Sequence, residues 1–197
     1  NGGGRIFNGD LYFDYTFWFN IYGGLMPVSI NGQTGAVTGL AALPDSAMSS
    51  GSIIQVKQAF KTDAASTTST SFTDISGLSV SITASSASNK FLITCNISAS
   101  CDSNIDAFLI LLKDSTEIAS GTGGSVENMF ALIRETDDRI VDSFALNFLD
   151  TAGDTNAHTY KIQFRTSNSS NPLVINRRNH DAAFGLPSSI TVMEVAA

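Results

Sequence analysis

The chain has 197 residues, of which 43% are hydrophobic and only 15% charged, and its formal net charge is -7 at pH 7. This length fits one sizeable domain with an appendage better than two full domains. The negative charge argues against nucleic-acid binding, which requires a cationic surface. We also expect no membrane insertion, because Asp14, Asn20 and a glycine pair interrupt the apolar N-terminal stretch well before about 20 apolar residues accumulate.

Residues 1–28 are unusually aromatic, with seven aromatic rings between Tyr12 and Tyr22. If this segment is extended, alternate residues from Leu11 to Ile21 form one continuous apolar face. Such a face is too apolar to leave in water, and aromatic side chains are preferred interface anchors. We therefore expect a docking segment for a partner, although the segment could also pack as a strand on its own head domain. The candidate docking residues are Phe13, Tyr15, Phe17, Trp18 and Phe19.

Residues 29–52 are expected to be a connector, and residues 53–197 a head domain built from strands. Apolar and polar residues alternate repeatedly with period two in the head, which is typical of half-buried strands. Turn-rich clusters of Ser, Thr, Asn, Asp and Gly separate these runs, and the spacing predicts about eight to ten antiparallel strands. The expected strands are 53–60, 71–75, 78–83, 90–99, 106–113, 139–148, 158–166, 172–176 and 189–195.

Two segments depart from simple alternation. Residues 106–113 are apolar on both parities, which predicts a strand covered on both faces, with another subunit as one candidate for the second cover. Residues 125–135 have apolar side chains at helical spacing, so their periodicity does not exclude a helix. We expect a strand there because the neighbouring elements are strands.

Together these patterns predict an all-β fold, an antiparallel β-sandwich with jelly-roll-like topology and an extended N-terminal arm. Jelly rolls of the tumour-necrosis-factor and C1q type are the nearest analogues. A sandwich leaves strand edges that require protection, and this chain has few charged residues to protect them. We therefore expect it to oligomerise, as a homotrimer by analogy with those folds.

Few residues are suited to catalysis. The chain has two histidines, His158 and His180, and no GxSxG motif. His158 shares parity with buried strand residues, which favours a structural role. His180 lies in INRRNHDAAFG, which is either a solvated turn with local ion pairs or a polar loop that contacts a ligand. The candidate contact residues of this loop are Arg177, Arg178, His180 and Asp181.

Other candidate sites are weak. Cys95 and Cys101 are expected to be buried free thiols, because on one strand they would lie about 20 Å apart. DSNIDA, residues 102–107, resembles the start of a calcium loop, but Ala107 replaces the required glycine and Lys113 the required glutamate. We expect no catalytic residue, no cofactor and no metal site, and hence no enzyme.

Two stretches resemble bacteriophage proteins. SINGQTGAVTGLAALPDSAM, residues 29–48, resembles the INGQTGAV-type connector of many tail fibres. Residues 51–197 resemble a C-terminal domain that recurs in virion structural proteins of marine bacteriophages, cyanophages especially. The segments that carry the second resemblance are GSIIQVKQAFKTDAASTTSTSFTDISGLSVSITASSASNKFLITCNISAS, DRIVDSFALNFLD, TYKIQF, VINR and SSITVMEVAA.

This resemblance implies a trimeric β-sandwich head on the exterior of a virion that is assembled in the host cytoplasm. Such a fibre or tail-fibre head contacts the host surface, through a glycan or a protein, and attaches to other virion proteins through its N-terminal segment. The main alternative is a capsid decoration or cement protein, which stabilises the capsid lattice without binding a receptor. A tail depolymerase and a secreted complement-like binding module are less favoured alternatives.

Overall fold

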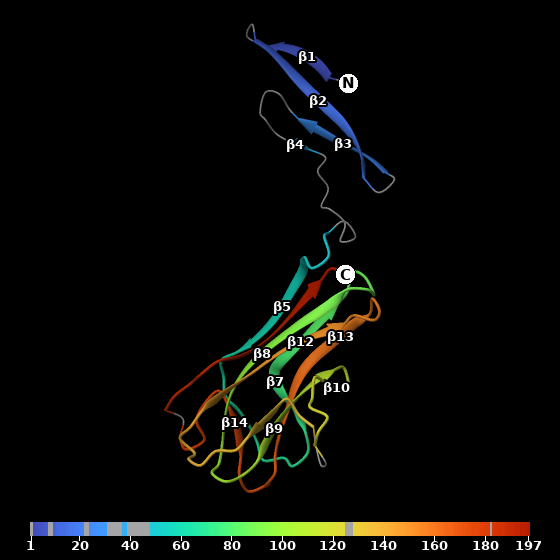
Figure 1. Cartoon of the computed structure of the whole chain (residues 1–197). Coiled ribbons are helices and arrows are strands. Elements are labelled where there is room, and N and C mark those ends of the chain that lie inside the picture. The colour runs from blue at the N-terminus through green and yellow to red at the C-terminus, as the bar shows by residue number, and fades with distance from the viewer. Residues whose placement is uncertain are drawn as a thin grey trace. The chain divides into compact units, whose positions relative to one another are not determined.

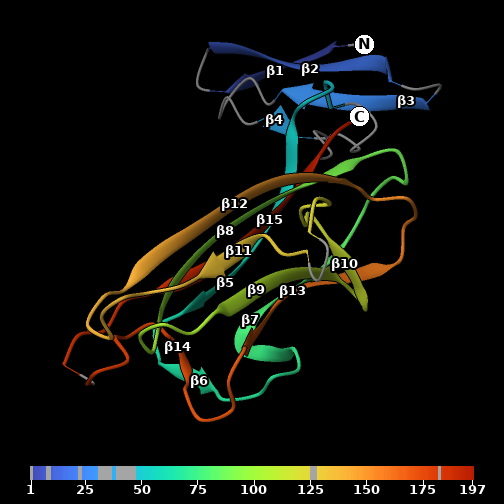
Figure 2. The same cartoon turned by 60° about the horizontal axis from the view of Figure 1, so that its bottom comes forward.

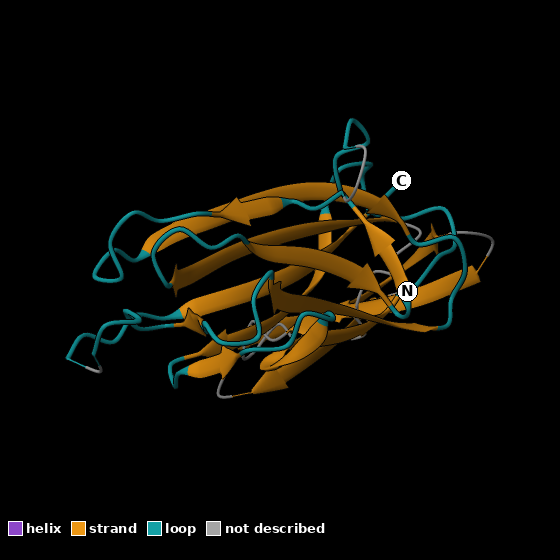
Figure 3. Cartoon of the chain, turned by 90° about the horizontal axis from the view of Figure 1, so that it is seen from below, coloured by secondary structure: helices purple, strands orange, loops and turns teal. Residues whose placement is uncertain are grey.

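The computed structural model describes residues 48–124, 128–181 and 183–197, together with the backbone of four strands before residue 48 (Figure 1). Every regular element among the described residues is a β-strand (Figure 3). The all-β prediction is therefore confirmed. The chain divides into two compact units, Asn1–Pro44 and Asp45–Ala197. The proposed functional boundaries at residues 28 and 52 stay predictions.

The N-terminal unit contains four antiparallel strands in sequential order. Its long strand β2 pairs with β1 along one edge and with β3 along the other, so that Tyr15 lies opposite both Gly2 and Ile30. The aromatic segment is thus extended over twelve residues. The side chains of the candidate docking residues, Phe13 to Phe19, lie outside the described part of the structure. The strands are β1 (Gly2–Phe7), β2 (Asp10–Ile21), β3 (Gly24–Ile30) and β4 (Val37–Thr38).

The head contains two antiparallel sheets. In the first sheet, β8 pairs with β12 along one edge and with β15 along the other, and β5 follows β15. β14 pairs with the end of β8 on the same edge as β15, and β6 pairs with β14. The strands of this sheet are β5 (Ile53–Lys61), β6 (Ala65–Thr67), β8 (Lys90–Cys101), β12 (Asp142–Thr151), β14 (Leu173–Ile175) and β15 (Ser188–Val195).

In the second sheet, β13 lies between β7 and β9. The two short strands β10 and β11 pair end to end along the other edge of β9. The strands of this sheet are β7 (Thr73–Thr83), β9 (Ala107–Lys113), β10 (Thr116–Ile118), β11 (Ala131–Ile133) and β13 (Ala157–Thr166).

The strand order is that of a jelly roll. Successive long strands alternate between the sheets: β7 lies in the second, β8 in the first, β9 in the second, β12 in the first and β13 in the second. The first and last strands of the head, β5 and β15, are neighbours, as are β7 and β13 (Figure 2). Two nested antiparallel sheets of this order confirm the predicted jelly-roll-like sandwich.

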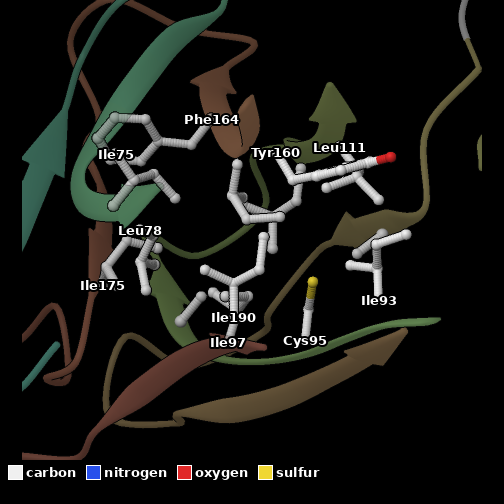
Figure 4. Close-up of a cluster of buried hydrophobic side chains, with 14 of the residues drawn as sticks. Ile75, Leu78, Ile93, Cys95, Ile97, Leu111, Tyr160, Phe164, Ile175 and Ile190 are labelled. Carbon is white, nitrogen blue, oxygen red and sulfur yellow. The ribbon is translucent and has the colours of Figure 1, made fainter. Parts of the chain in front are cut away.

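The core lies between the two sheets and is formed by the side chains whose parity the sequence predicted (Figure 4). On β8 the buried apolar residues from Phe91 to Ala99 lie at every second position. On β13 the fully buried Tyr160 contacts Phe91 edge-on, with ring centroids 5.8 Å apart. Close-packed aliphatic and aromatic side chains of this kind provide most of the stability of a domain.

Several boundaries differ from the predictions. The predicted strands 71–75 and 78–83 are joined in one strand, β7, which begins at Thr73 and continues past Gly77 with its positive φ of 85°. Strand β12 begins at Asp142, since Ile140 donates its N–H to Asp137 O in a turn. The short strands β6, β10 and β11 raise the number of strands in the head to eleven, β5–β15.

The two segments that depart from simple alternation, residues 125–135 and 106–113, differ in structure. Within residues 125–135, only Ala131–Ile133 form a strand, while 128–130 are irregular and 125–127 lie outside the described residues. Strand β9 is buried on both faces, as predicted. Its second cover comes from the same chain and not from another subunit: Arg165 stacks on Phe108, for example, at 3.9 Å from the ring centroid.

Candidate functional site

The predicted contact loop lies at the end of the head farthest from the point where the connector enters. At the proximal end, Gly51 N donates to Ala196 O and Ala196 N donates to Ser52 O, both at 2.9 Å. At the distal end, Ser188 at the start of β15 lies opposite Lys61 at the end of β5. Residues 176–187 connect β14 to β15 at this distal end, and we call them the distal loop.

Asn176 fixes the base of the distal loop. It is buried and adopts a positive φ of 65°, which Asn tolerates better than most residues. Its Nδ2 donates to Lys61 O at 2.9 Å and to Asp63 O at 3.0 Å, and its Oδ1 accepts from Ser188 Oγ. The loop is closed above Asn176 by a bridge between Arg177 and Gly185. The base of the loop is therefore held by hydrogen bonds to the end of the edge strand β5 and to the start of β15.

Within the loop, Arg178 and Asp181 form a bidentate ion pair. The Arg178 side chain holds the pKa of Asp181 down to about 2, with a further contribution from the Ala183 N–H. The Arg178 guanidinium also lies 4.5 Å from the ring centroid of Phe184, which is largely exposed. These contacts shape the loop internally, because a bidentate pair of this kind restricts both side chains.

His180 links the distal loop to the turn that precedes β12. Its backbone N donates to Asp138 O at 2.9 Å, and its Nδ1 lies 3.2 Å from Asp138 Oδ2. Arg139 Nη2 lies 3.4 Å from His180 Nε2. Residues 137–139 and the distal loop are thus joined by contacts between their polar groups.

Arg177 differs from its neighbour Arg178. Its backbone bridges to Gly185, while its half-exposed side chain has no ion-pair partner among the described residues. The two arginines that the sequence paired therefore have different structural roles. Arg178 is used inside the loop, whereas the Arg177 side chain makes no ion pair with the described residues.

A buried carboxylate lies at the same end of the head. Glu135 is 3% exposed, and Ser100 Oγ donates to its Oε2 at 3.4 Å. Its Oε1 has no hydrogen-bond partner among the described residues. Burial, with a contribution from the negative charge of Asp142, raises the pKa of Glu135 to about 7.

The other titratable candidates have structural surroundings. His158 lies between two carboxylates, with Nδ1 2.7 Å from Asp114 Oδ2 and Nε2 3.1 Å from Asp154 Oδ1. Cys95 and Cys101 are free and buried on β8, as predicted. Burial raises the pKa of Cys95 to about 12 and that of Cys101 to about 11, so neither is a thiolate nucleophile near neutral pH.

The described residues contain no group of three His, Cys, Asp or Glu side chains arranged to hold a metal ion. In the incomplete calcium-loop sequence, Asp102 accepts hydrogen bonds from Ser103 N and Asn171 Nδ2, and Asp106 pairs with Arg134. No helix long and apolar enough to cross a bilayer occurs in the part of the chain that the structure describes.

Sequence reasoning missed several parts of this site. Glu135 and Asp138 lie in the charged run RETDDR, residues 134–139, and the proximity of this run to the distal loop follows only from the pairing of β12 with β8. Asn176 did carry a signal, because an Asn directly after the apolar run LVI favours a left-handed turn.

Comparisons with known proteins add little. No family model matches the chain, and no curated protein is significantly similar to it. A structure of the infectious bursal disease virus Gx strain superposes with a TM-score of 0.41 and 12% identity, over 98% of this chain and 48% of that one. The VP2 subviral particle of the same virus gives 0.33 and 14%, over 87% and 48%. The chain spans about half the length of both structures, and similarities this weak carry no argument about its function.

Proposed function

We propose that this protein is a bacteriophage virion structural protein, a trimeric fibre or tail-fibre head on the exterior of the particle. The proposal is supported by the resemblance of residues 29–48 and 51–197 to phage connector and virion sequences, and by the jelly-roll head that follows the connector. In this proposal the N-terminal segment, with Phe13, Tyr15, Phe17, Trp18 and Phe19, attaches the head to other virion proteins.

One observation carries the proposal that the head contacts the host. The connector enters at the proximal end, and the distal loop with its available Arg177 lies at the opposite end of β15. A head attached to the particle through its N-terminal side would therefore present the distal loop outward. Loops supported by a rigid scaffold are the usual location of binding residues. The proposed ligand is a host surface glycan or protein with anionic or hydrogen-bonding groups.

Arginine substitutions test this contact. Arg177→Ala removes the available cation without disturbing the loop, so we expect adsorption of particles to host cells to fall severalfold while assembly is unchanged. Lys57→Ala, which removes a positive charge from the exposed part of β5, is the matched control and should leave adsorption unaltered. Unchanged adsorption of the Arg177→Ala particles would contradict a role for the loop.

A capsid decoration protein, which stabilises the capsid lattice without binding a receptor, is the second candidate. It would need no distal contact, and its copy number would match the capsid lattice. Quantitative mass spectrometry of purified particles separates the two, because a fibre head is present in a few trimers per tail.

A further inference from the structure

The outward face of the first sheet carries apolar side chains in strict register. Val56 on β5 lies opposite Met193 on β15, Met193 lies opposite Leu92 on β8, and Leu92 lies opposite Leu149 on β12. This row crosses four neighbouring strands, and its parity is opposite to that of the core residues Ile93 and Val192. Cross-strand pairs in register form a continuous surface.

The two ends of this row are exposed to a degree that is unusual for aliphatic side chains, while Met193 and Leu92 between them are half-buried. Val56 is 54% exposed and Leu149 56% exposed, at the two edges of the sheet. Ile53, beside Val195, and Phe60, beside Ser189, extend the apolar surface along β5. Four of the eight large apolar side chains exposed among the described residues therefore lie on one sheet face. Contiguous apolar surface of this kind marks an interaction site.

Charged residues avoid the same face. The strands β5, β8, β12 and β15 contain six charged residues, and five of them have the inward parity, at the margins of the core. The five are Lys57, Lys61, Asp142, Asp150 and Glu194, whose partners or neighbours in register include the buried Val192, Ala99 and Phe91. Lys90 is the one charged residue with outward parity.

Between the apolar positions, the outward face is uncharged. The next row of the register is Gln58, Thr191, Thr94 and Asn147, and Gln58 Nε2 donates to Thr191 Oγ1 at 2.8 Å. We call the outward side chains of β5, β15, β8 and β12 the neutral face. Apolar groups surrounded by hydroxyls and amides, with charges depleted at the centre, are characteristic of subunit interfaces.

Charge also identifies the partner. Because each chain has a net charge of -7, copies repel one another over most of their surface. At the neutral face, copies can meet without burying charged groups and without placing like charges against each other. Burial of an unpaired charge is costly. A strongly cationic or anionic partner would find no complementary charge on it. A second copy, with the same uncharged surface, matches it.

We propose that the neutral face is the surface through which copies of this chain associate, centred on Val56, Met193, Leu92 and Leu149. This inference deepens the proposed homotrimer, but it is tested on the purified full-length protein and does not depend on the particle.

Leu149→Glu and Leu132→Glu form a matched pair of variants. Leu149 lies on the neutral face and is 56% exposed, whereas Leu132 on β11 in the second sheet is 54% exposed. Sedimentation velocity should give the wild type a mass above that of the 20.8 kDa chain, and three times that mass if the associated form is the proposed homotrimer. Leu149→Glu should weaken association at least about a hundredfold, and Leu132→Glu should leave it unchanged.

Circular dichroism and thermal melting show whether each variant is folded. If Leu149→Glu does not fold, Val56→Glu at the other edge of the row replaces it. A monomeric wild type overturns the proposal. A monomer is the result expected if residues 1–44 of the same chain, and not another copy, cover the neutral face. An unchanged mass for a folded Leu149→Glu or Val56→Glu variant overturns it too. Loss of adsorption by particles with intact trimers would bear on the distal loop and not on this interface.

Discussion

Glu135 is a single residue whose ionisation should affect the stability of the whole head. Its pKa is raised by burial from the ordinary value of 4.5 to about 7. The folded protein therefore binds a proton that the unfolded chain has lost between about pH 4.5 and pH 7, and stability decreases as the pH rises through that window. A tenfold change in proton affinity is worth about 1.4 kcal/mol, so the loss is at most about 3 kcal/mol.

Substitution of Glu135 tests this sign. Glu135→Gln keeps a hydrogen-bonding group near Ser100 but cannot ionise, so we expect it to stabilise the protein at pH 8 by about 1–3 kcal/mol and to have little effect at pH 4. Urea unfolding at both pH values measures the difference. Glu117→Gln, at an exposed position on β10, is the control. A Glu135→Gln variant that is less stable at pH 8 would contradict the buried-carboxylate account.

Individual residues were predictable from the sequence where alternation alone decided their environment. Cys95, Tyr160 and Ile162 are buried as their parity requires. Glu135 was not predictable, because its burial depends on packing between β11, β8 and the turn after residue 135, and a glutamate in the charged run RETDDR gives no sign of this. The difference between Arg177 and Arg178 also depends on three-dimensional contacts, namely the pair that Arg178 makes with Asp181.

At the scale of elements, Glu194 holds the proximal end of the first sheet together. This buried carboxylate on β15 accepts hydrogen bonds from Gln55 on β5, from Ser85 N and Oγ, and from Asn89 Nδ2 in the turn before β8. Burial acts to raise the pKa of Glu194, but the hydrogen bonds from Gln55, Asn89 and Ser85 outweigh it and hold the pKa below its ordinary value. The carboxylate therefore joins β15, β5 and the β7–β8 turn.

Glu194→Gln should destabilise the head. The N–H groups of the new glutamine amide would face the hydrogen-bond donors of Gln55, Ser85 or Asn89, which bind a carboxylate oxygen in the wild type. Leaving such a buried donor unsatisfied costs about 1–3 kcal/mol. The pKa of Glu194 is lowered in the folded protein, so its ionised form stabilises the fold above the pKa of the unfolded chain, and this stabilisation is lost as the pH falls. The difference in stability between wild type and variant should therefore be full at pH 7 and smaller at pH 3. Equal stability of wild type and variant at pH 7 in thermal melts would contradict this role.

The elements themselves were largely predictable, because period-two alternation was clear in the long strands of the head other than β9, which was predicted from its continuous apolar run. The short strands β6, β10 and β11 have three residues each, too few for a period to be detected. The jelly-roll order follows from long-range pairing, such as that of β5 with β15, and the sequence indicated it only through strand number and fold analogy.

For the whole molecule, the head is a rigid two-sheet sandwich with distinct surfaces at different positions. The connector enters at the proximal end, the distal loop projects at the other, and the neutral face covers the outer side of the first sheet. If these surfaces serve attachment, host contact and self-association respectively, one chain provides what an external virion component requires. No reaction is needed for such a role, since its effect depends on binding and durability.

Electron cryomicroscopy of purified phage particles, with this chain traced in the density, tests the central claim most directly. The proposal predicts trimers on the particle exterior, packed through Val56 and Leu149, with residues 1–28 against another virion protein and residues 176–187 facing outward. Particles without this chain, or copies arranged on the capsid lattice with the distal loop buried against it, would contradict the claim.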